Sequence, residues 1–269
     1  MKVLFIYPDF TLDIDPVTKG VQGLEEGGWY MEGLASMSAV LKGKGHDVAL
    51  YHIIRPVGRD AFARRLQQEQ PDLVGFTAGT RSFPFVKEYA RWVKDTLDVP
   101  IICGGYHPDS FPEEVAAVPE IDVVSLGEGE ETMVELCERL AAGRPYLDLA
   151  GAWVKANGEV VRNPSRPLIT DLDGMPLPDF ALFDFDQLVG TAIGSGMAVL
   201  SRGCPYSCAY CINPRTRALY PNCKHYWRQR SPQRSVEYVE ELLSLRPELQ
   251  VIQFCSDMFG PNIPWLTEF

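Results

Sequence analysis

The amino-acid sequence predicts an α/β protein: a doubly wound parallel sheet, followed by the opening βα units of an incomplete (β/α) barrel. Between residues 2 and 143, short apolar runs alternate with amphipathic stretches of helical length, which is the pattern of parallel strands joined by helical crossovers. Several apolar runs are continuous, as expected for strands that helices cover on both faces. A new strand–helix–strand pattern begins at residue 197.

The first half of the chain contains five strand candidates and five helix candidates. The strands are expected at Val3–Tyr7, Asp47–Tyr51, Leu73–Thr77, Pro100–Cys103 and Asp122–Leu126. The helices are expected at Trp29–Lys44, Arg59–Glu69, Pro84–Leu97, Pro112–Val118 and Glu130–Ala142. Five strands with crossovers of this length predict a flavodoxin-like or Rossmann-like sheet.

Residues 145–196 change in character and are expected to connect two domains. Ala152–Val161 is expected to form a β-hairpin around an Asn-Gly turn, and the proline-rich stretch Asp171–Pro178 is expected to be extended. We therefore expect an N-terminal domain at residues 1–144 and a second domain at residues 197–269.

The second domain is expected to begin with a strand at Met197–Leu200, whose carboxyl end carries a cysteine-rich loop. A helix is expected at Ser231–Leu245, capped by Ser231 or Ser235, and a second strand at Gln250–Phe254. The helix is expected to bury Val236, Val239, Leu242 and Leu243. Because two strands cannot close a barrel, we expect this chain to be the N-terminal portion of a longer enzyme or a truncated gene product.

The cysteine-rich loop holds Cys204, Cys208 and Cys211 in Cys-x3-Cys-x2-Cys spacing. Three thiolates this close together can ligate three irons of a cubane [4Fe–4S] cluster and leave the fourth iron open to a small molecule. A structural zinc site is the alternative, with Cys223 or His225 as an irregularly spaced fourth ligand. A disulfide is less favoured, because the chain has seven cysteines and no secretory signal. The spacing favours the cluster over zinc.

Glycine-rich turns follow three of the strands in the first domain, at Gly75–Thr80, Gly104–His107 and Gly127–Thr132. Ligands of doubly wound sheets bind beyond the carboxyl ends of the strands, and glycine there lets the backbone approach a ligand closely. Each turn alone is a weak signal that loop punctuation would also explain. No Gly-x-Gly-x-x-Gly follows the first strand, so a nicotinamide dinucleotide site is not expected.

Composition excludes several classes of protein. The net charge of −11 argues against a nucleic-acid partner. No apolar run approaches the ~20 residues of a membrane span, and the start, Met1–Tyr7, lacks the flanks of a signal peptide. A cytoplasmic location, where thiols stay reduced, is therefore expected.

The loop Cys204–Cys211, with an aromatic residue before its last cysteine, resembles the signature of the radical S-adenosylmethionine (SAM) enzymes. The resemblance implies iron ligation by the three cysteines, with Tyr206 and Tyr210 shaping the loop around SAM. The end of the second strand resembles the acidic motif of that family, so Asp257 is expected to help position SAM. A turn-capping role is the alternative for this aspartate.

The segments up to about residue 143 resemble, in their order, the cobalamin-binding domain that precedes many radical SAM domains. They are a first strand ending in Tyr-Pro, then Leu41–Val48, Pro71–Thr77, Cys103–Pro108 and Gly127–Thr132. The resemblance implies that the dimethylbenzimidazole tail of cobalamin threads into this domain. The implied contacts are Thr77, Gly79, Gly104 and Gly105 around the tail, and Gly127 and Glu128 near the corrin.

One departure concerns the lower ligand of cobalt. Some cobalamin domains supply it from an Asp-x-His-x-x-Gly loop after the first strand, whereas the loop here, Pro8–Asp13, has no histidine. Imidazole ligation is therefore not predicted. His107 is the histidine of the glycine-rich turns, and we favour it as a hydrogen-bonding loop residue over a cobalt ligand.

Positive charge is concentrated in one segment. Residues 202–234 contain seven Lys or Arg residues and no Asp or Glu. The functional interpretation is that this segment offsets an anionic cluster, the SAM carboxylate or an acidic substrate. A solvated basic loop is the equally favoured alternative.

Together the resemblances imply a cobalamin-dependent radical SAM enzyme that cleaves SAM reductively and transfers a methyl group to an unactivated carbon of a small molecule. Cyclisation and rearrangement use the same parts. The implied cofactors are a [4Fe–4S] cluster, SAM and cobalamin, with a flavodoxin or ferredoxin as electron donor. The alternatives are a non-catalytic cobalamin-binding module and a zinc-stabilised α/β protein.

Overall fold

The computed structural model describes residues 1–9, 13–14, 21–22, 28–221 and 223–269. Its main feature is a seven-stranded sheet in the order β4-β1-β5-β6-β7-β8-β9. The first five of these strands run parallel, and β8 and β9 continue the sheet antiparallel. The strands are β1 (Lys2–Pro8), β4 (Asp47–Ile53), β5 (Leu73–Thr77), β6 (Ile101–Gly104), β7 (Val123–Ser125), β8 (Ala152–Ala156) and β9 (Glu159–Arg162).

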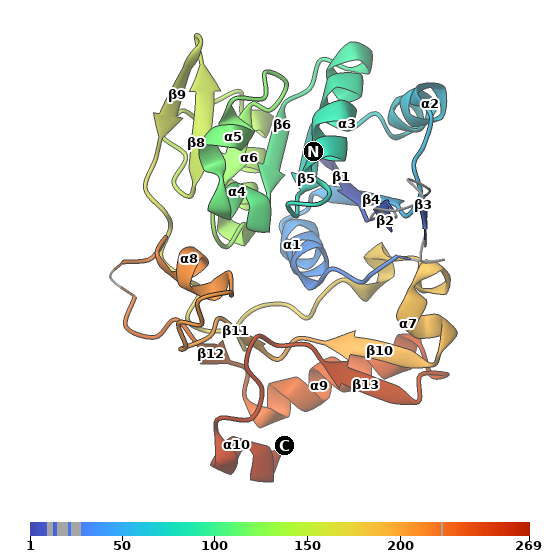
Figure 1. Ribbon diagram of the computed structural model, residues 1–269, viewed down its shortest axis with the longest axis vertical. Coiled ribbons are helices and arrows are strands. Elements are labelled where there is room, and N and C mark those ends of the chain that lie inside the picture. The colour runs from blue at the N-terminus through green and yellow to red at the C-terminus, as the bar shows by residue number, and fades with distance from the viewer. Residues whose placement is uncertain (10–12, 15–20, 23–27, 222) are drawn as a thin grey trace.

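Helices cover both faces of this sheet, as Figure 1 shows. They are α1 (Glu32–Gly43), α2 (Arg59–Glu69), α3 (Phe83–Thr96), α4 (Tyr106–Ser110), α5 (Pro112–Ala116) and α6 (Glu130–Ala141). In β1, Val3 and Phe5 pack into the core under α1 and α6, whereas Leu4 and Ile6 pack into the core under α2, α3 and α5. The alternation explains why β1 is a continuous apolar run, since both of its faces are buried.

The parallel part of the sheet has the strand order 2-1-3-4-5, which is that of the flavodoxin-like doubly wound fold. The predicted fold class is therefore confirmed. The hairpin that the sequence analysis assigned to the connector instead extends this sheet, because β8 pairs with β7 through Ala152–Val154. Its turn residue Asn157 has a positive φ of 52°, as an Asn-Gly hairpin turn requires.

The second α/β unit lies below the sheet in Figure 1. Two parallel strands, β10 (Ser195–Ala198) and β13 (Val251–Phe254), pair with each other, and α9 (Pro232–Leu245) connects them. Two short strands, β11 (Ser201–Arg202) and β12 (Arg228–Gln229), pair antiparallel. The other short elements of the chain are β2 (Asp13–Ile14) and β3 (Val21–Gln22), which follow β1, and η1 (Phe180–Leu182), η2 (Phe185–Gln187), α7 (Val189–Ala192), α8 (Asn213–Arg217) and α10 (Ile263–Glu268).

The buried face of α9 agrees with the prediction in part. Leu242 is buried as predicted and Val239 and Leu243 are half-buried, whereas Val236 is 37% exposed and Ser235 and Tyr238 are buried. The Tyr238 hydroxyl on the inward face donates to Glu32 Oε2 at 2.7 Å across the boundary between the two units. Leu242 and Tyr238 belong to the same apolar core as Phe5, so one core joins the sheet to the second unit.

Across the described residues, no helix is both long and apolar enough to cross a bilayer. The loop after β1, whose sequence offers no histidine to ligate cobalt, has residues 10–12 outside the described part of the chain.

Candidate functional site

The cysteine-rich loop leaves the second unit directly after β11, at the carboxyl side of β10. Gly203 starts the loop with a φ of +76°, and a Cβ built on it would lie 2.3 Å from the carbonyl oxygen of Tyr226. A glycine is therefore required where the chain enters the loop. All three loop cysteines are free thiols; Cys208 is exposed, and Cys204 and Cys211 are partly buried.

Hydrogen bonds from the following helix hold this loop in shape. The Arg217 guanidinium donates to the carbonyl oxygen of Pro205 at 3.0 Å and to Ser207 Oγ at 2.6 Å. The Cys211 sulfur accepts from the backbone N–H of Asn213 at 3.5 Å and from Asn213 Nδ2 at 3.6 Å. Hydrogen bonds of this kind to cysteine sulfur tune the reduction potential of iron–sulfur clusters.

The donor set of the loop fits a cluster ligated at three different irons. No group of three or more His, Cys, Asp and Glu side chains in the described residues is gathered so as to hold one metal ion. Cluster ligation does not require the three sulfurs to share one point, because each thiolate binds a separate iron. Three free thiols within eight residues, one of which already accepts two N–H groups, satisfy the chemistry of such a cluster.

The loop after β13 is tied to the strand that carries the cysteines. Ser256 Oγ accepts from the backbone N–H groups of Leu200 and Ser201 at 3.0 and 3.1 Å, and Ser201 Oγ donates to the carbonyl oxygen of Met258 at 2.9 Å. The neighbouring Asp257 is exposed. These bonds hold Asp257 at the same end of the two strands as the cysteine-rich loop.

The two loop tyrosines point outward. Tyr206 is 57% exposed and Tyr210 is 94% exposed. Both therefore present ring surface to the outside of the loop. Their roles around SAM stay a prediction.

At the carboxyl edge of the sheet, the turns after β5 and β6 pack on each other. A Cβ on Gly105, whose φ is +105°, would lie 2.9–3.0 Å from backbone atoms of Ala78, so this glycine is needed for the contact between the two turns. Gly79 differs, because a Cβ there would meet only Ser82 Oγ at 3.8 Å. Gly104 is intermediate, with Ser125 Cβ at 3.4 Å.

His107 lies inside the protein. It is only 3% exposed, packs against Phe83 with tilted rings whose centroids are 4.1 Å apart, and has Nδ1 3.3 Å from Thr80 Oγ1. Its Nε2 lies 3.6 Å from Glu114 Oε2. Burial lowers the pKa of His107, with Glu114 opposing that effect. Its Nδ1 is the ring nitrogen within hydrogen-bond distance of a partner, whereas Nε2 is buried without one among the described residues. The choice between a hydrogen-bonding role and cobalt ligation stays a prediction.

The turn after β7, predicted to lie near the corrin, is filled by protein side chains. The Gly127 N–H donates to Asp109 Oδ1 at 2.7 Å, and the Glu128 N–H donates to the Tyr220 hydroxyl at 2.8 Å. A Cβ on Gly127 would lie 1.9 Å from that hydroxyl. Burial raises the pKa of Asp109 to about 6, although the bond from Gly127 opposes the rise. The backbone at Gly79 thus borders open space, whereas Gly127 is covered by Tyr220.

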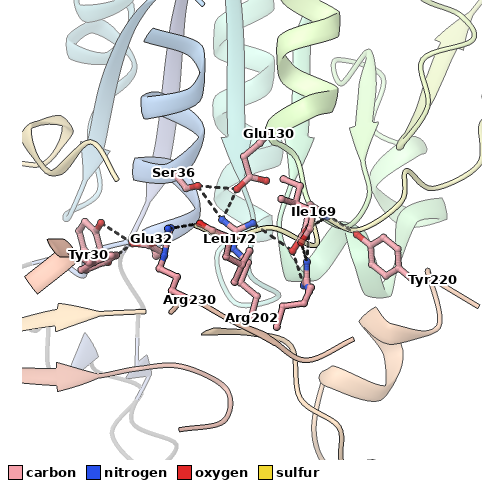
Figure 2. A network of polar contacts seen from close by, with 12 residues as sticks. Tyr30, Glu32, Ser36, Glu130, Ile169, Leu172, Arg202, Tyr220 and Arg230 are labelled. Atoms are coloured by element: carbon pink, nitrogen blue, oxygen red, sulfur yellow. Dashed lines mark hydrogen bonds and ion pairs between the residues drawn. The ribbon is translucent and has the colours of Figure 1, made fainter. Parts of the chain in front are cut away.

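Glu128 takes part in a network that the sequence analysis did not anticipate. Figure 2 shows this network, with Ser36, Glu130 and Arg202 among its labelled residues. Its Oε2 accepts from the Ile169 N–H and from Arg228 Nη1, both at 3.0 Å. Its Oε1 lies 2.8 Å from Arg228 Nη2 and 3.5 Å from Arg202 Nη1. The Arg202 Nη2 donates to Glu130 Oε1 at 2.6 Å and to Ser36 Oγ at 3.0 Å.

Two of the seven cations of the basic segment, Arg202 and Arg228, pair with carboxylates at the carboxyl edge of the sheet. The role of the segment toward a cluster, SAM or a substrate stays a prediction. Burial acts to raise the pKa of Glu130, but Arg202 holds it below its usual value. The sequence signal for this interface was the segregation of charge, with seven cations in residues 202–234 and the acidic run Glu128–Glu131.

A second part of the same boundary surrounds Glu32, in the first turn of α1. Its carboxylate accepts from the hydroxyls of Tyr238 at 2.7 Å and Tyr30 at 2.9 Å. Burial raises the pKa of Glu32 to about 7, even though the two tyrosines, Arg202 and Arg230 all act to lower it. Arg230 is itself buried and donates to the carbonyl oxygen of Leu172 at 2.6 Å.

The turn after β6 also faces the cysteine-rich loop. Burial raises the pKa of the Tyr106 hydroxyl, and the nearby charges of Asp257 and Cys211 add to the rise. The Arg215 guanidinium in α8 donates to the carbonyl oxygen of Ser110 at 3.0 Å. The predicted cobalamin edge and the predicted cluster loop therefore meet across one boundary.

Comparison with known proteins gives the context of this arrangement. Residues 26–137 match the family described as B12 binding domain. An uncharacterized methyltransferase of Pyrococcus horikoshii is 30% identical over 233 residues, covering 86% of this chain and 49% of the relative. The anaerobic magnesium-protoporphyrin IX monomethyl ester cyclase of Rubrivivax gelatinosus is 25% identical over 256 residues, covering 90% of this chain and 43% of the relative.

The fold has counterparts among solved structures. The cobalamin-dependent S-adenosylmethionine radical enzyme OxsB, solved with aqua-cobalamin and S-adenosylmethionine bound, superposes with a TM-score of 0.73 at 18% identity. The alignment covers 99% of this chain and 35% of OxsB. The chain spans about half the length of the curated relatives it matches. Residues 26–137 thus match a B12 binding domain, the relatives include a methyltransferase and a cyclase, and the chain as a whole shares the fold of a cobalamin-dependent radical SAM enzyme.

Proposed function

We propose that this chain is the cofactor-binding part of a cobalamin-dependent radical SAM enzyme that transfers a methyl group to an unactivated carbon of a small molecule. The observation that carries the proposal is the meeting of two features at one boundary. Three free thiols lie on one loop after β11, and this loop faces the carboxyl edge of a flavodoxin-like sheet. The similarity to a methyltransferase over 86% of the chain supports the type of reaction.

In this proposal the residues of the chain hold and orient the cofactors. Cys204, Cys208 and Cys211 ligate the [4Fe–4S] cluster, and Asn213 donates to the Cys211 sulfur from outside the cluster. Asp257 and the exposed tyrosines of the loop border the space for SAM. When bound, the cluster supplies one electron for SAM cleavage and cobalamin carries the methyl group.

Cobalamin is placed at the side of the sheet edge that the protein leaves free. The turns at Thr77–Gly79 and Gly104–Gly105 line that side, and a side chain on Gly79 would extend into open space. His107 supports the second of these turns from inside the protein. Glu128 lies beside this space, with its carboxylate held by Arg228.

The cluster assignment is tested by anaerobic reconstitution with iron and sulfide. We expect close to four irons per chain, because three thiolates on one loop match a [4Fe–4S] cluster with one open iron. Cys208→Ala should abolish iron uptake, whereas Cys255→Ala, which removes an exposed cysteine outside the loop, should not. Stoichiometric zinc in the purified protein, with no uptake of iron, would contradict the assignment and favour a zinc-stabilised fold.

The cobalamin assignment is tested with hydroxocobalamin and the full chain. Gly79→Val should weaken binding about ten-fold or more, because its side chain would occupy the space left for the ligand while meeting no protein atom closer than 3.8 Å at Cβ. Gly58→Val, at a remote glycine that also faces open space, is the matched control. Equal affinity of the two variants and the unchanged chain would show that the ligand does not lie beside Gly79.

Ring closure is the second candidate reaction, favoured by the similarity to the magnesium-protoporphyrin ester cyclase over 90% of the chain. SAM carrying an isotope label in its methyl group separates the two reactions, since methyl transfer places the label in the product and ring closure does not.

A flavodoxin- or ferredoxin-type electron donor and a cytoplasmic location complete the proposal. Both follow from the need for a low-potential electron and for reduced thiols.

A further inference from the structure

The cysteine-rich loop belongs to a long excursion of the chain whose two ends are held together. The excursion, residues 203–227, starts after β11 and ends before β12, and the register of this two-stranded ladder pairs Arg202 with Arg228. We call the β11–β12 ladder the stem. Whatever holds the stem therefore determines where the three cysteines lie.

Both arginines of the stem bind the carboxyl edge of the sheet. Two guanidinium nitrogens of Arg228 lie 2.8 and 3.0 Å from the two carboxylate oxygens of Glu128. Arg228 also donates to the carbonyl oxygen of Ile169 at 2.7 Å. Arg202 binds Glu130 at 2.6 Å and lies 3.5 Å from Glu128. The four side chains are 5–18% exposed. The stem is therefore fixed at two adjacent points by desolvated, forked contacts.

The acceptor side of the contact is equally constrained. Glu128 follows β7 directly, and its backbone N–H donates to the Tyr220 hydroxyl at 2.8 Å. The Gly127 N–H is held by Asp109, and the Glu128 side chain accepts from the Ile169 N–H. Tyr220 lies within the excursion itself, so the excursion contacts the same turn at a third point.

A buried contact between arginine and glutamate is expected to fix the position of the stem more than it adds to the stability of the fold. Buried ion pairs add little to stability compared with apolar residues of the same size, because desolvation offsets the attraction between the charges. A displaced stem, however, would leave a buried charge without a partner, which is strongly unfavourable. The apolar core shared by the two units can hold them together, but a non-directional interaction does not fix their register.

We propose that Glu128, Arg202 and Arg228 are positioning residues that set the cysteine-rich loop at a fixed distance from the carboxyl edge of the sheet, and with it the cluster from the cobalamin. The part of this inference that concerns the two cofactors rests on the function proposed above. Radical chemistry between two cofactors depends on such placement, because an error of about 1 Å can lower a rate on the order of 100-fold.

The first experiment needs no cofactor and measures amide hydrogen exchange of the full chain. Glu128→Gln should speed exchange about ten-fold in both halves of the stem, residues 199–203 and 226–230, because Arg228 loses its charged partner. Asp95→Asn, which removes the partner of Arg59 in an exposed ion pair, should leave these segments unchanged. Faster exchange confined to residues 126–130 would overturn the proposal, since it would make the effect of Glu128 purely local.

The second experiment separates positioning from stability. The double variant Glu128→Gln/Arg228→Met keeps an oxygen that can accept from the Ile169 N–H and leaves no charge unpaired in this contact, so its thermal midpoint should recover most of the loss seen in Glu128→Gln. With iron, sulfide and hydroxocobalamin loaded and reduced, the magnetic interaction between cluster and cob(II)alamin should still be weakened, because the fixed spacing is lost. A native interaction in the double variant would overturn the proposal.

The two experiments also separate this inference from the proposed function. If the unchanged chain takes up a cluster but no cobalamin, the cobalamin assignment fails, and the hydrogen exchange result still decides whether the stem is positioned by Glu128. If both cofactors bind and the stem exchanges equally fast in all variants, the proposed function stands and the positioning role is refuted.

Discussion

At Glu32, one carboxyl group is placed where its ionisation opposes folding. Burial raises its pKa from an ordinary 4.5 to about 7, so the folded chain holds the proton more tightly than the unfolded chain does. Stability from this group is fully present below pH 4.5 and is lost as the pH rises towards 7. The loss is on the order of 2 kcal/mol, with allowance for the partial exposure of the side chain.

We therefore expect Glu32→Gln to flatten the dependence of stability on pH between about 5 and 8. The free energy of unfolding of the unchanged chain, measured in urea, should fall relative to the variant over this interval and then run parallel to it. Glu237→Gln is the control, because Arg234 lowers the pKa of Glu237, so the stability that this group contributes is fully present above about pH 5 and is lost only as the pH falls further. Parallel curves for Glu32→Gln and the unchanged chain from pH 5 to 8 would contradict the expectation.

Single residues differ in how far the sequence alone could assign them. The spacing of the loop cysteines is enough by itself to limit their chemistry, because ligation of one cluster by a single loop requires short separations along the chain. Glu128 was predicted near the corrin from its motif, yet its carboxylate is occupied by Arg228, which follows it by 100 residues. No local pattern encodes a contact over such a separation.

On the scale of elements, α9 offers two serines that were both candidates for its N-cap. Ser231 Oγ accepts from the Arg234 N–H at 3.1 Å, whereas Ser235 Oγ is buried without a hydrogen-bond partner among the described residues. Ser231→Ala should therefore destabilise the chain by about 1 kcal/mol. Ser235→Ala should cost less than about 0.5 kcal/mol or stabilise it, since the removed hydroxyl makes no bond.

The comparison is made by urea unfolding of the two alanine variants beside the unchanged chain. Equal losses of stability would mean that Ser231 contributes no more than any serine in this helix, and the capping assignment would then fail. A larger loss for Ser235→Ala would point to a hydrogen bond made by the buried hydroxyl.

Most elements could be predicted because both faces of the sheet are buried. Continuous apolar runs located the strand at Leu73–Thr77, and Arg59–Glu69 forms a helix with the predicted bounds. The inward face of α9 was predicted only in part: spacing identified Leu242 but not Tyr238, whose hydroxyl donates to Glu32 on a distant element. The hairpin at β8 and β9 was recognised, but its pairing with β7 depends on tertiary contacts.

On the scale of the whole chain, acidic and basic side chains that lie in separate parts of the sequence pair with each other in the folded protein. The acidic turn after β7 and the start of α6 meet the arginines of the stem, while an apolar core runs without interruption from β1 to α10. The sheet and the second unit should therefore unfold together in one cooperative transition, although they are built from separate strand–helix patterns.

Arg202 is the residue whose loss should break this cooperativity. It contacts Ser36, Glu128 and Glu130 at once. Arg202→Met keeps an apolar stem but leaves Glu130, only 5% exposed, without a cation, which should cost about 3–5 kcal/mol. Calorimetry should then resolve a separate unfolding transition of the second unit at a lower temperature, whereas Arg59→Met, at an exposed ion pair, should leave a single transition.

Adding Glu130→Gln to Arg202→Met should restore most of the lost stability, because the buried negative charge is removed with its partner. A single unshifted transition in Arg202→Met would mean that the apolar core alone couples the two units.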